Sequence, residues 1–304
     1  MTGSPLPPPE SAELEPSVQR SADVIALTGS PLTAAMLGSA LSAAGVAEGA
    51  VVIVHSSLSR VGWVVGGAQA VVAALLRQVG GAGTVVMPSL SSDLSDPAGW
   101  VAPPVPADWW PIIRAEMPAY DPLLTPTTSM GAVVECFRHV RGAVRSQHPA
   151  DSFVAFGPQA EFVIHPHPLS PAFGETSPLA RLYDLDATVV LLGVGHDNNT
   201  SLHLAEARAS CAAPVVTCGA PMLVNGQRQW VEFDDLDYDS DDFVALGEAF
   251  AATGRETRTS LGIGTITTCP VRDIVDFGVE WLNTNRASPA ASAPSGEIGQ
   301  VVRP

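Results

Sequence analysis

Two side chains that can move a proton, His203 and Glu206, stand three residues apart in a segment with the polarity of a short helix. Thr200 or Ser201 is placed to cap that helix at its N-terminus. Residues at positions i and i+3 share one helix face, so we expect the imidazole and the carboxylate to project together from the first turn. A histidine in that position is suited to act as a general base.

The segment before this helix predicts where the histidine lies. An apolar run from Thr188 ends in Gly193 and Gly195, which is typical of a buried strand that stops at a turn. In an open α/β sheet, ligands bind outside the carboxyl ends of the strands. We therefore expect the chemical centre of the protein at the end of this strand.

The same pair allows two other interpretations. His/Glu pairs at this spacing occur in carboxylate-bridged iron sites, but those sites need a second motif of the type E-x-x-H, which the sequence lacks. The sequence His165-Pro-His167 offers two more imidazoles, in a loop context. We expect no metal. A buried structural His203 whose hydrogen bonds are satisfied by Glu206 stays open as an alternative.

The elements around the pair follow the order of an α/β protein. Helix-like and strand-like segments alternate, and strand, helix and strand at this spacing form a βαβ unit, which implies a parallel sheet. We expect a central, mostly parallel sheet flanked by helices, with a smaller β-containing subregion and long active-site loops. These expectations rest on a helix at 32–41, a strand at 50–54, a helix at 68–79, a strand at 84–87, a proline-rich loop at 88–126, and a hairpin turn at Asn225-Gly226.

Composition predicts one large domain at 29–285, after a disordered segment at 1–28 and before a flexible tail at 286–304. The first twenty residues lack the features of a signal peptide, and no apolar run approaches the ~20 residues that span a bilayer. The four cysteines contain no C-x-x-C pair and are expected to be free thiols. We expect a cytoplasmic protein.

The net charge of −16, from 15 basic and 31 acidic residues, argues against binding to nucleic acid. It would attract a cationic ligand, although acidity also serves solubility alone. The densest acidic stretch, 232–242, alternates like a calcium loop, but Ser240 and Leu246 replace the required Gly and Glu. Either this is a solvated loop, or Asp234 or Asp235 faces the site and orients a base or binds a cation.

The loop 55–67 joins the first predicted strand to the next long helix. Its Gly66-Gly67 pair would let a ligand approach the backbone, and the following helix N-terminus offers free N–H groups to a phosphate. The spacing matches neither dinucleotide nor P-loop fingerprints. A simple tight turn is the alternative, and the polar run His55-Ser-Ser57 favours ligand binding.

Together these segments resemble the aminoglycoside 3-N-acetyltransferase family, antibiotic acetyltransferases with a fold distinct from the GNAT superfamily. The resemblance spans about residues 32–281. It rests on six motifs in order, namely Val54-His-Ser-Ser-Leu-Ser-Arg-Val-Gly-Trp-Val-Val-Gly-Gly67 with Gly83-Thr-Val-Val-Met-Pro-Ser89, Tyr120-Asp-Pro122, Met130-Gly131, Arg145-Ser-Gln-His-Pro149, Gly174-Glu-Thr-Ser-Pro-Leu-Ala-Arg181 and 193–206.

The resemblance implies acetyl transfer from acetyl-CoA to the 3-amino group of a 2-deoxystreptamine aminoglycoside, which confers resistance. His203 matches the family's catalytic histidine, and its acidic partner falls at Asp234 or Asp235, where the family commonly has Glu. With Glu206, these are the expected catalytic residues. The resemblance places acetyl-CoA at His55, Ser56, Ser57, Leu58, Val64, Val65, Gly66, Gly67 and Ser129. It places the drug at Asp93, Tyr120, Asp121, Asp197, Asn199, Glu206 and Asp234.

A histidine supported by a carboxylate can deprotonate an alkylammonium so that the amine attacks a thioester directly. Donors near Ser56 and Ser57 would stabilise the oxyanion. We therefore expect direct transfer in a ternary complex, by a monomer or homodimer. Two alternatives remain, an acetyltransferase for another small amine and a polycation-binding protein without chemistry.

Overall fold

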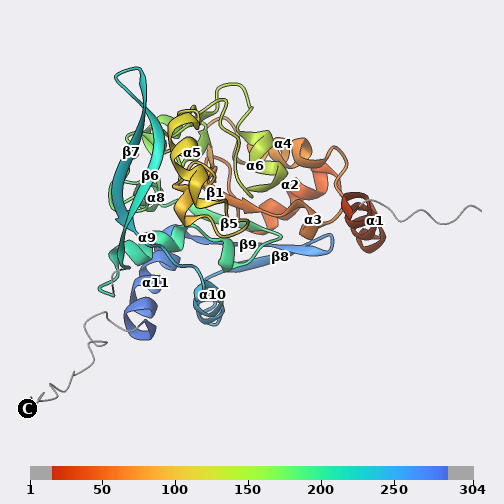
Figure 1. The fold of residues 1–304 in the computed structure, drawn as a ribbon. Helices are drawn as coiled ribbons and strands as arrows, with labels where there is room; N and C mark the ends of the chain where they lie inside the picture. The colour runs from red at the N-terminus through yellow and green to blue at the C-terminus, as the bar shows by residue number, and fades with distance from the viewer. Residues whose placement is uncertain (1–15, 212, 287–304) are drawn as a thin grey trace, which may run out of the picture.

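The protein is described by a computed structural model that defines residues 16–211 and 213–286 (Figure 1). A seven-stranded sheet lies at its centre. In spatial order, its strands are β3 (Val144–Arg145), β4 (Phe153–Phe156), β2 (Thr84–Pro88), β1 (Val51–Ser56), β5 (Thr188–Leu192), β9 (Gly264–Pro270) and β8 (Thr257–Leu261). The central strands are apolar along almost their whole length, as expected for strands covered on both faces.

The three central strands carry the parallel pairing predicted by the βαβ pattern. β1 pairs in parallel with β2 and with β5, so the carboxyl ends of these strands meet at one edge of the sheet. The outer pairings, β2 with β4, β4 with β3, β5 with β9 and β9 with β8, are antiparallel. The α/β class is confirmed, and the parallel part of the sheet is confined to its middle.

Helices cover both faces, and the alternation of side chains along β1 gives each face its own core. Val52 and Val54 pack with the helices of one face, and Ile53 packs with those of the other. The first face holds α2 (Ala34–Ala43), α4 (Gly67–Val79) and α6 (Gly131–Phe137). The second holds α7 (Ala160–Ile164), α8 (Pro178–Asp184), α9 (Ser201–Arg208), α10 (Phe243–Ala251) and α11 (Val271–Asn285).

A separate two-stranded sheet forms the smaller β-containing subregion. β6 (Val215–Val224) and β7 (Gln227–Leu236) are joined by Asn225 and Gly226, both with positive φ, as a two-residue hairpin turn requires. The hairpin lies at one end of the molecule in Figure 1, with α1 at the other. The predicted hairpin is therefore confirmed.

The N-terminal expectation needs a correction. Residues 16–28, expected to be disordered, form helix α1 (Pro16–Thr28), and the rest of the predicted 1–28 segment lies outside the described residues. The Thr28 hydroxyl accepts a 2.8 Å hydrogen bond from the Trp63 N–H, which ties the helix to the loop after β1. Of the predicted tail, 287–304 also lies outside the described residues.

Short helices make the remaining connections. α3 (Leu58–Val61) follows β1, and η3 (His196–Asn198) follows β5. The proline-rich stretch after β2 contains η1 (Pro97–Gly99), η2 (Ala107–Trp109) and α5 (Trp110–Glu116). Within the parts of the chain that the structure defines, no helix is both long and apolar enough to cross a membrane.

Gly193 ends β5 under a tight constraint. Its φ is +71°, and an added Cβ would lie 2.8 Å from Val61 Cγ2 and 2.9 Å from the Ser57 carbonyl oxygen. Gly193→Ala is expected to lower the free energy of unfolding by about 1–3 kcal/mol, measured by urea denaturation. Gly38→Ala is the matched control, because Gly38 lies within α2 with open space around it and should leave stability equal or raise it. Equal urea midpoints for Gly193→Ala and wild type would contradict this account.

Candidate active site

His203 lies on α9, the helix that follows the carboxyl end of β5. Its Nδ1 hydrogen-bonds to Glu206 Oε2, as the spacing of three residues predicts. A carboxylate accepts, so Nδ1 donates, and in the neutral imidazole Nε2 then keeps its lone pair. The His203 side chain is 17% exposed and that of Glu206 is 1% exposed. The pair therefore presents one basic nitrogen at the edge of a buried carboxylate.

Three aromatic rings fix the plane of the imidazole. Phe173 stacks on His203 with centroids 5.0 Å apart and planes inclined by 16°. Phe243 lies 5.0 Å away and Tyr238 5.4 Å away, with their rings tilted against it. These contacts and the Glu206 hydrogen bond restrict rotation of the ring. A general base needs such a fixed orientation.

Neither Asp234 nor Asp235 hydrogen-bonds with His203 in the described structure. Asp234 is exposed on β7 and accepts a 2.9 Å hydrogen bond from the Thr217 hydroxyl. Asp235 is buried, and its oxygens accept from the backbone N–H of Ala172, at 3.2 and 3.3 Å, and of Leu236 at 2.8 Å. The carboxylate beside His203 is thus Glu206, from the same helix, instead of an aspartate from the distant hairpin.

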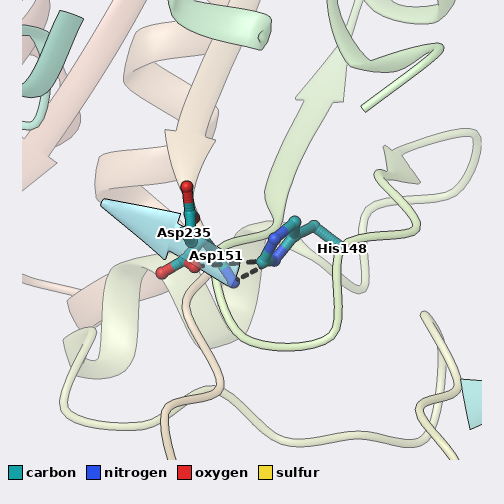
Figure 2. Close-up of side chains that lie close together, drawn as sticks. All are labelled: His148, Asp151 and Asp235. Atoms are coloured by element: carbon teal, nitrogen blue, oxygen red, sulfur yellow. Dashed lines mark hydrogen bonds and ion pairs between the residues drawn. The ribbon is translucent and has the colours of Figure 1, made fainter. Parts of the chain in front are cut away.

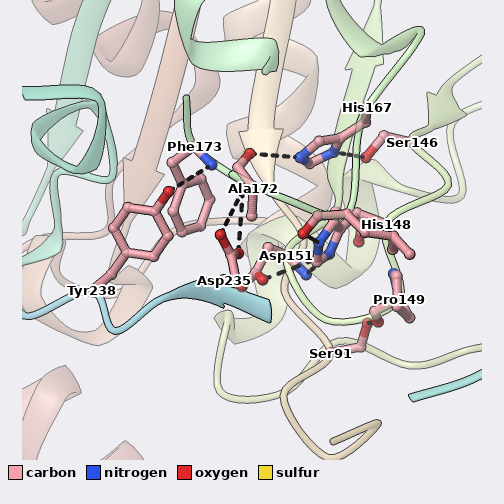
Figure 3. Close-up of polar contacts among 12 residues, drawn as sticks. Ser91, Ser146, His148, Pro149, Asp151, His167, Ala172, Phe173, Asp235 and Tyr238 are labelled. Atoms are coloured by element: carbon pink, nitrogen blue, oxygen red, sulfur yellow. Dashed lines mark hydrogen bonds and ion pairs between the residues drawn. The ribbon is translucent and has the colours of Figure 1, made fainter. Parts of the chain in front are cut away.

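Asp235 hydrogen-bonds to Ala172, which precedes Phe173 (Figure 3). The Phe173 ring in turn stacks on His203. While Asp235 holds the Ala172 N–H, His167 Nε2 donates a 2.9 Å hydrogen bond to the Ala172 carbonyl. The Tyr238 hydroxyl accepts from the Phe173 N–H at 3.2 Å. Burial raises the pKa of Asp235 and of Tyr238. This network sets where the Phe173 ring lies against His203.

A group of possible metal ligands lies beside this network. One ligand atom each from His148, Asp151 and Asp235 lies within 4.8 Å of the others (Figure 2). His148 is fully used, however, because Nδ1 accepts a 2.8 Å hydrogen bond from the Asp151 N–H and Nε2 donates to the Leu169 carbonyl at 3.2 Å. With no imidazole lone pair free, the donor set does not fit a metal ion without rearrangement.

A cavity of about 650 Å³ lies at the end of β1. Of the residues expected to bind acetyl-CoA, Ser56, Ser57, Leu58, Val64, Gly67 and Ser129 line it. His55, Val65 and Gly66 do not. Sequence reasoning missed Arg20 and Val24 of α1, which also line the cavity, because the N-terminal segment was expected to be disordered.

The charge of this cavity differs from that of the whole protein. Its walls contain Arg20 and Arg60 and, in the described part of the chain, no acidic side chain, although the protein has a net charge of −16. A cavity with that lining favours an anionic ligand over a cationic one.

His55 takes a different position from its serine neighbours. It points to the same face of β1 as Ile53, it is 7% exposed, and neither ring nitrogen has a hydrogen-bond partner among the described residues. Burial, with smaller contributions from His196 and His203, lowers the pKa of His55 to about 3. His55 is therefore a neutral imidazole next to the His203 pair.

The residues expected to bind the drug divide into two groups. Tyr120, Asp121 and Asn199 have structural partners, since the Tyr120 hydroxyl donates to the Ser146 carbonyl at 2.7 Å, Asp121 caps a turn and the Asn199 side chain contacts His196 and the Ser201 N–H. Asp93 is exposed, and Asp197 bonds only to its neighbour Asn198. These two side chains, and that of the exposed Asp234, are open to a ligand, whereas Glu206 is buried against His203.

A second histidine–glutamate pair supports the loop after β5, and the sequence did not predict it. His196 Nε2 lies 3.0 Å from Glu256 Oε2, and both side chains are about 5% exposed or less. Gly247 makes room for it, since a Cβ there would lie 2.4 Å from the His196 Cβ. Glu256 lies far along the chain, so no local pattern signals this contact.

Comparison with known proteins identifies relatives of this chain in sequence and in fold. A family model described as aminoglycoside 3-N-acetyltransferase matches residues 53–283. The SPbeta prophage-derived aminoglycoside N(3')-acetyltransferase-like protein YokD of Bacillus subtilis is 42% identical over 263 residues, which cover 86% of this chain and 96% of that protein. Its crystal structure matches with a TM-score of 0.85 and covers 87% of this chain and 98% of that one.

Two further relatives are informative. Aminoglycoside N(3)-acetyltransferase VIII of Streptomyces fradiae is 36% identical over 287 residues, which cover 89% of this chain and 99% of that protein. A structure described as AAC-IIIb binary with CoASH is 31% identical, with a TM-score of 0.76, and covers 86% of this chain and 99% of that one. These matches confirm the family resemblance and the fold that it implies.

The buried imidazoles make stability depend on pH. The pKa of His55 and that of His167 are both lowered to about 3, whereas an unfolded imidazole binds a proton near pH ~6.5. Stability from these groups is therefore complete above about pH 6.5 and falls on acidification toward pH 3, by up to about 1.4 kcal/mol per pH unit for each.

His55→Gln removes one of these groups. When the pH falls from about 7 to about 4.5, the free energy of unfolding decreases. In this variant, the decrease measured by urea denaturation is expected to be about 2 kcal/mol smaller than in wild type. His139→Gln, at an exposed histidine, should keep the wild-type loss. A wild-type loss in His55→Gln as well would show that His55 is protonated in the folded protein.

Proposed function

Because the chain belongs to the aminoglycoside 3-N-acetyltransferase family, we propose that it transfers the acetyl group of acetyl-CoA to the 3-amino group of a 2-deoxystreptamine aminoglycoside. The observation that carries the proposal is the His203–Glu206 pair on the helix after β5, with a cavity at the end of the neighbouring strand β1 that has no acidic side chain among its described residues. A proton acceptor and an anion-favouring cavity are the two parts that this reaction needs.

The chemistry follows from the geometry of the pair. His203 Nε2 takes a proton from the attacking amine while the amine nitrogen bonds to the thioester carbonyl carbon. The carbon–sulfur bond then breaks, the amide forms, and the CoA thiolate takes the proton from His203. Glu206 holds Nδ1–H and stabilises the imidazolium formed in between. Transfer is direct, in a ternary complex.

The oxyanion formed on the carbonyl needs hydrogen-bond donors. Ser56 is one of the residues that line the cavity, and its buried hydroxyl has no hydrogen-bond partner in the described structure. It supports the assignment of Ser56 as such a donor, with Ser57 beside it. We further propose that acetyl-CoA occupies this cavity, as the relative named with CoASH suggests.

We propose that the aminoglycoside, a polycation, binds through exposed carboxylates. Asp93 and Asp197, whose carboxylates are open to a ligand, are the proposed contacts for its ammonium groups. The activity would confer aminoglycoside resistance and proceeds, in our proposal, in the cytoplasm, where the four free cysteines stay reduced.

Replacing His203 tests the reaction and its base together. His203→Ala and His203→Gln are expected to lower kcat/KM by about two to four orders of magnitude, because no other group takes the proton from the amine. The measurement is thiol release from acetyl-CoA with gentamicin, kanamycin and apramycin, with His139→Gln as the control at an exposed histidine.

The wild-type rate should also fall on acidification, since a protonated imidazole cannot accept a proton. Near wild-type turnover in His203→Ala would remove His203 from the mechanism. Drug binding without thiol release, for every drug, would instead favour a polycation-binding protein, and release only with another small amine would favour a different substrate.

The two arginines of the cavity test where acetyl-CoA binds. Arg20→Ala and Arg60→Ala are each expected to raise KM for acetyl-CoA by about 3- to 10-fold, with kcat and KM for the drug little changed. Arg77→Ala, at an exposed residue of α4 outside the cavity, is the control. Acetyl-dephospho-CoA, which lacks the 3′-phosphate, shows which phosphate each arginine binds. If an arginine binds the 3′-phosphate, its replacement should no longer raise KM when this compound is the co-substrate. Unchanged KM for acetyl-CoA in both variants would place the cofactor elsewhere.

A further inference from the structure

Glu206 is a buried carboxylate that needs hydrogen-bond partners on both of its oxygens. Its side chain is 1% exposed, and its two oxygens have different partners. Oε2 accepts from His203 Nδ1, and Oε1 accepts from the Asp239 N–H at 3.1 Å and from Arg286 Nη1. A buried anion is costly unless it is paired and hydrogen-bonded. The contact of Arg286 with Oε1 therefore affects the charge and orientation of the carboxylate that His203 contacts through Oε2.

Arg286 follows the C-terminal end of α11 and is held by three groups at once. Besides Glu206, its guanidinium donates two hydrogen bonds to Asp242, at 2.6 and 2.7 Å, and one to the Asp239 carbonyl at 2.7 Å. A bidentate arginine–carboxylate pair has fixed geometry as well as charge. Asp242 therefore places the guanidinium, and the guanidinium in turn places Glu206.

We propose that Arg286 is a positioning residue of the active site, which holds Glu206 ionised and oriented so that His203 presents a free Nε2 to the substrate amine. This inference rests on the proposed role of His203. It adds a residue outside the matched family segment, which ends at residue 283. Arg286 touches the reacting atoms only through Glu206 and His203.

The charges around the pair fix the sign of the expected effect. The titratable groups that face it are Asp239 and Asp242 before α10, Tyr238, His55 from β1 and Arg286 from α11. Arg286 is the one permanent cation among them. Its removal makes the His203–Glu206 pair bind a proton more readily, whichever of the two residues receives it. The fraction of enzyme with a free Nε2 then falls at a higher pH than in wild type.

The experiment compares Arg286→Met with Arg286→Lys and with Arg272→Met. Arg272 lies on the same helix and pairs with exposed Asp186, without contact to Glu206. For Arg286→Met we expect kcat to fall about 10- to 100-fold with little change in either KM. The acid limb of kcat/KM should move to higher pH by about one unit. Arg272→Met should keep the wild-type profile.

Arg286→Lys separates charge from geometry. It retains the cation without the bidentate fork, so its acid limb should stay near that of wild type while kcat falls less than in Arg286→Met. If Arg286→Met does not fold, a shift of the limb in Arg286→Lys would overturn the proposal by itself. A wild-type pH profile in a folded Arg286→Met would overturn it too and leave Arg286 a merely structural residue. Failure of the proposed base is distinct, because His203→Ala would then stay active.

Discussion

The organisation of the site depends on one buried carboxylate. Glu206 lies between the imidazole of His203 and the guanidinium of Arg286, almost without solvent. Water cannot stabilise its charge, so the surrounding elements must do so. α9 supplies the carboxylate and the histidine, the segment before α10 supplies a backbone donor, and α11 supplies the cation. These elements pack on one face of the sheet, where they also bury their apolar side chains.

The charge of the whole protein differs in sign from that of the cavity at the end of β1. The chain carries a net charge of −16, yet the cavity at the end of β1 is lined by hydroxyls, apolar groups and two arginines. In our proposal, overall acidity attracts a polycation to the surface, while the local lining admits an anionic co-substrate. In our proposal both ligands reach His203, which follows β5 and lies close enough to His55 of β1 to affect its pKa. Net charge alone predicted the first partner and gave no signal for the second.

Local features of the fold were predictable because they depend on neighbours in the chain. The spacing of His203 and Glu206 sets their contact on one helix turn, and Asn225-Gly226 sets the hairpin. The βαβ pattern predicted the parallel pairing of the central strands but not the antiparallel outer strands, because the period of a strand carries no direction. The choice of Asp234 or Asp235 as partner for His203 relied on family resemblance, and the helix geometry offered Glu206 instead. Arg286 and Glu256 lie too far along the chain for any spacing rule to find them.

The two ends of the domain complete a site whose chemistry lies in the middle of the sequence. α1 precedes the matched family segment and adds Arg20 to the cavity, and Arg286 follows that segment and reaches Glu206. Both are arginines in an acidic protein, and each lies near one end of the described chain. The central strands and α9 position His203 and Glu206, whereas the two arginines come from segments outside the matched part of the chain. Loss of the Arg286 cation would therefore change the charge around Glu206, while the contacts of the His203 ring with Phe173 and Phe243 come from other elements.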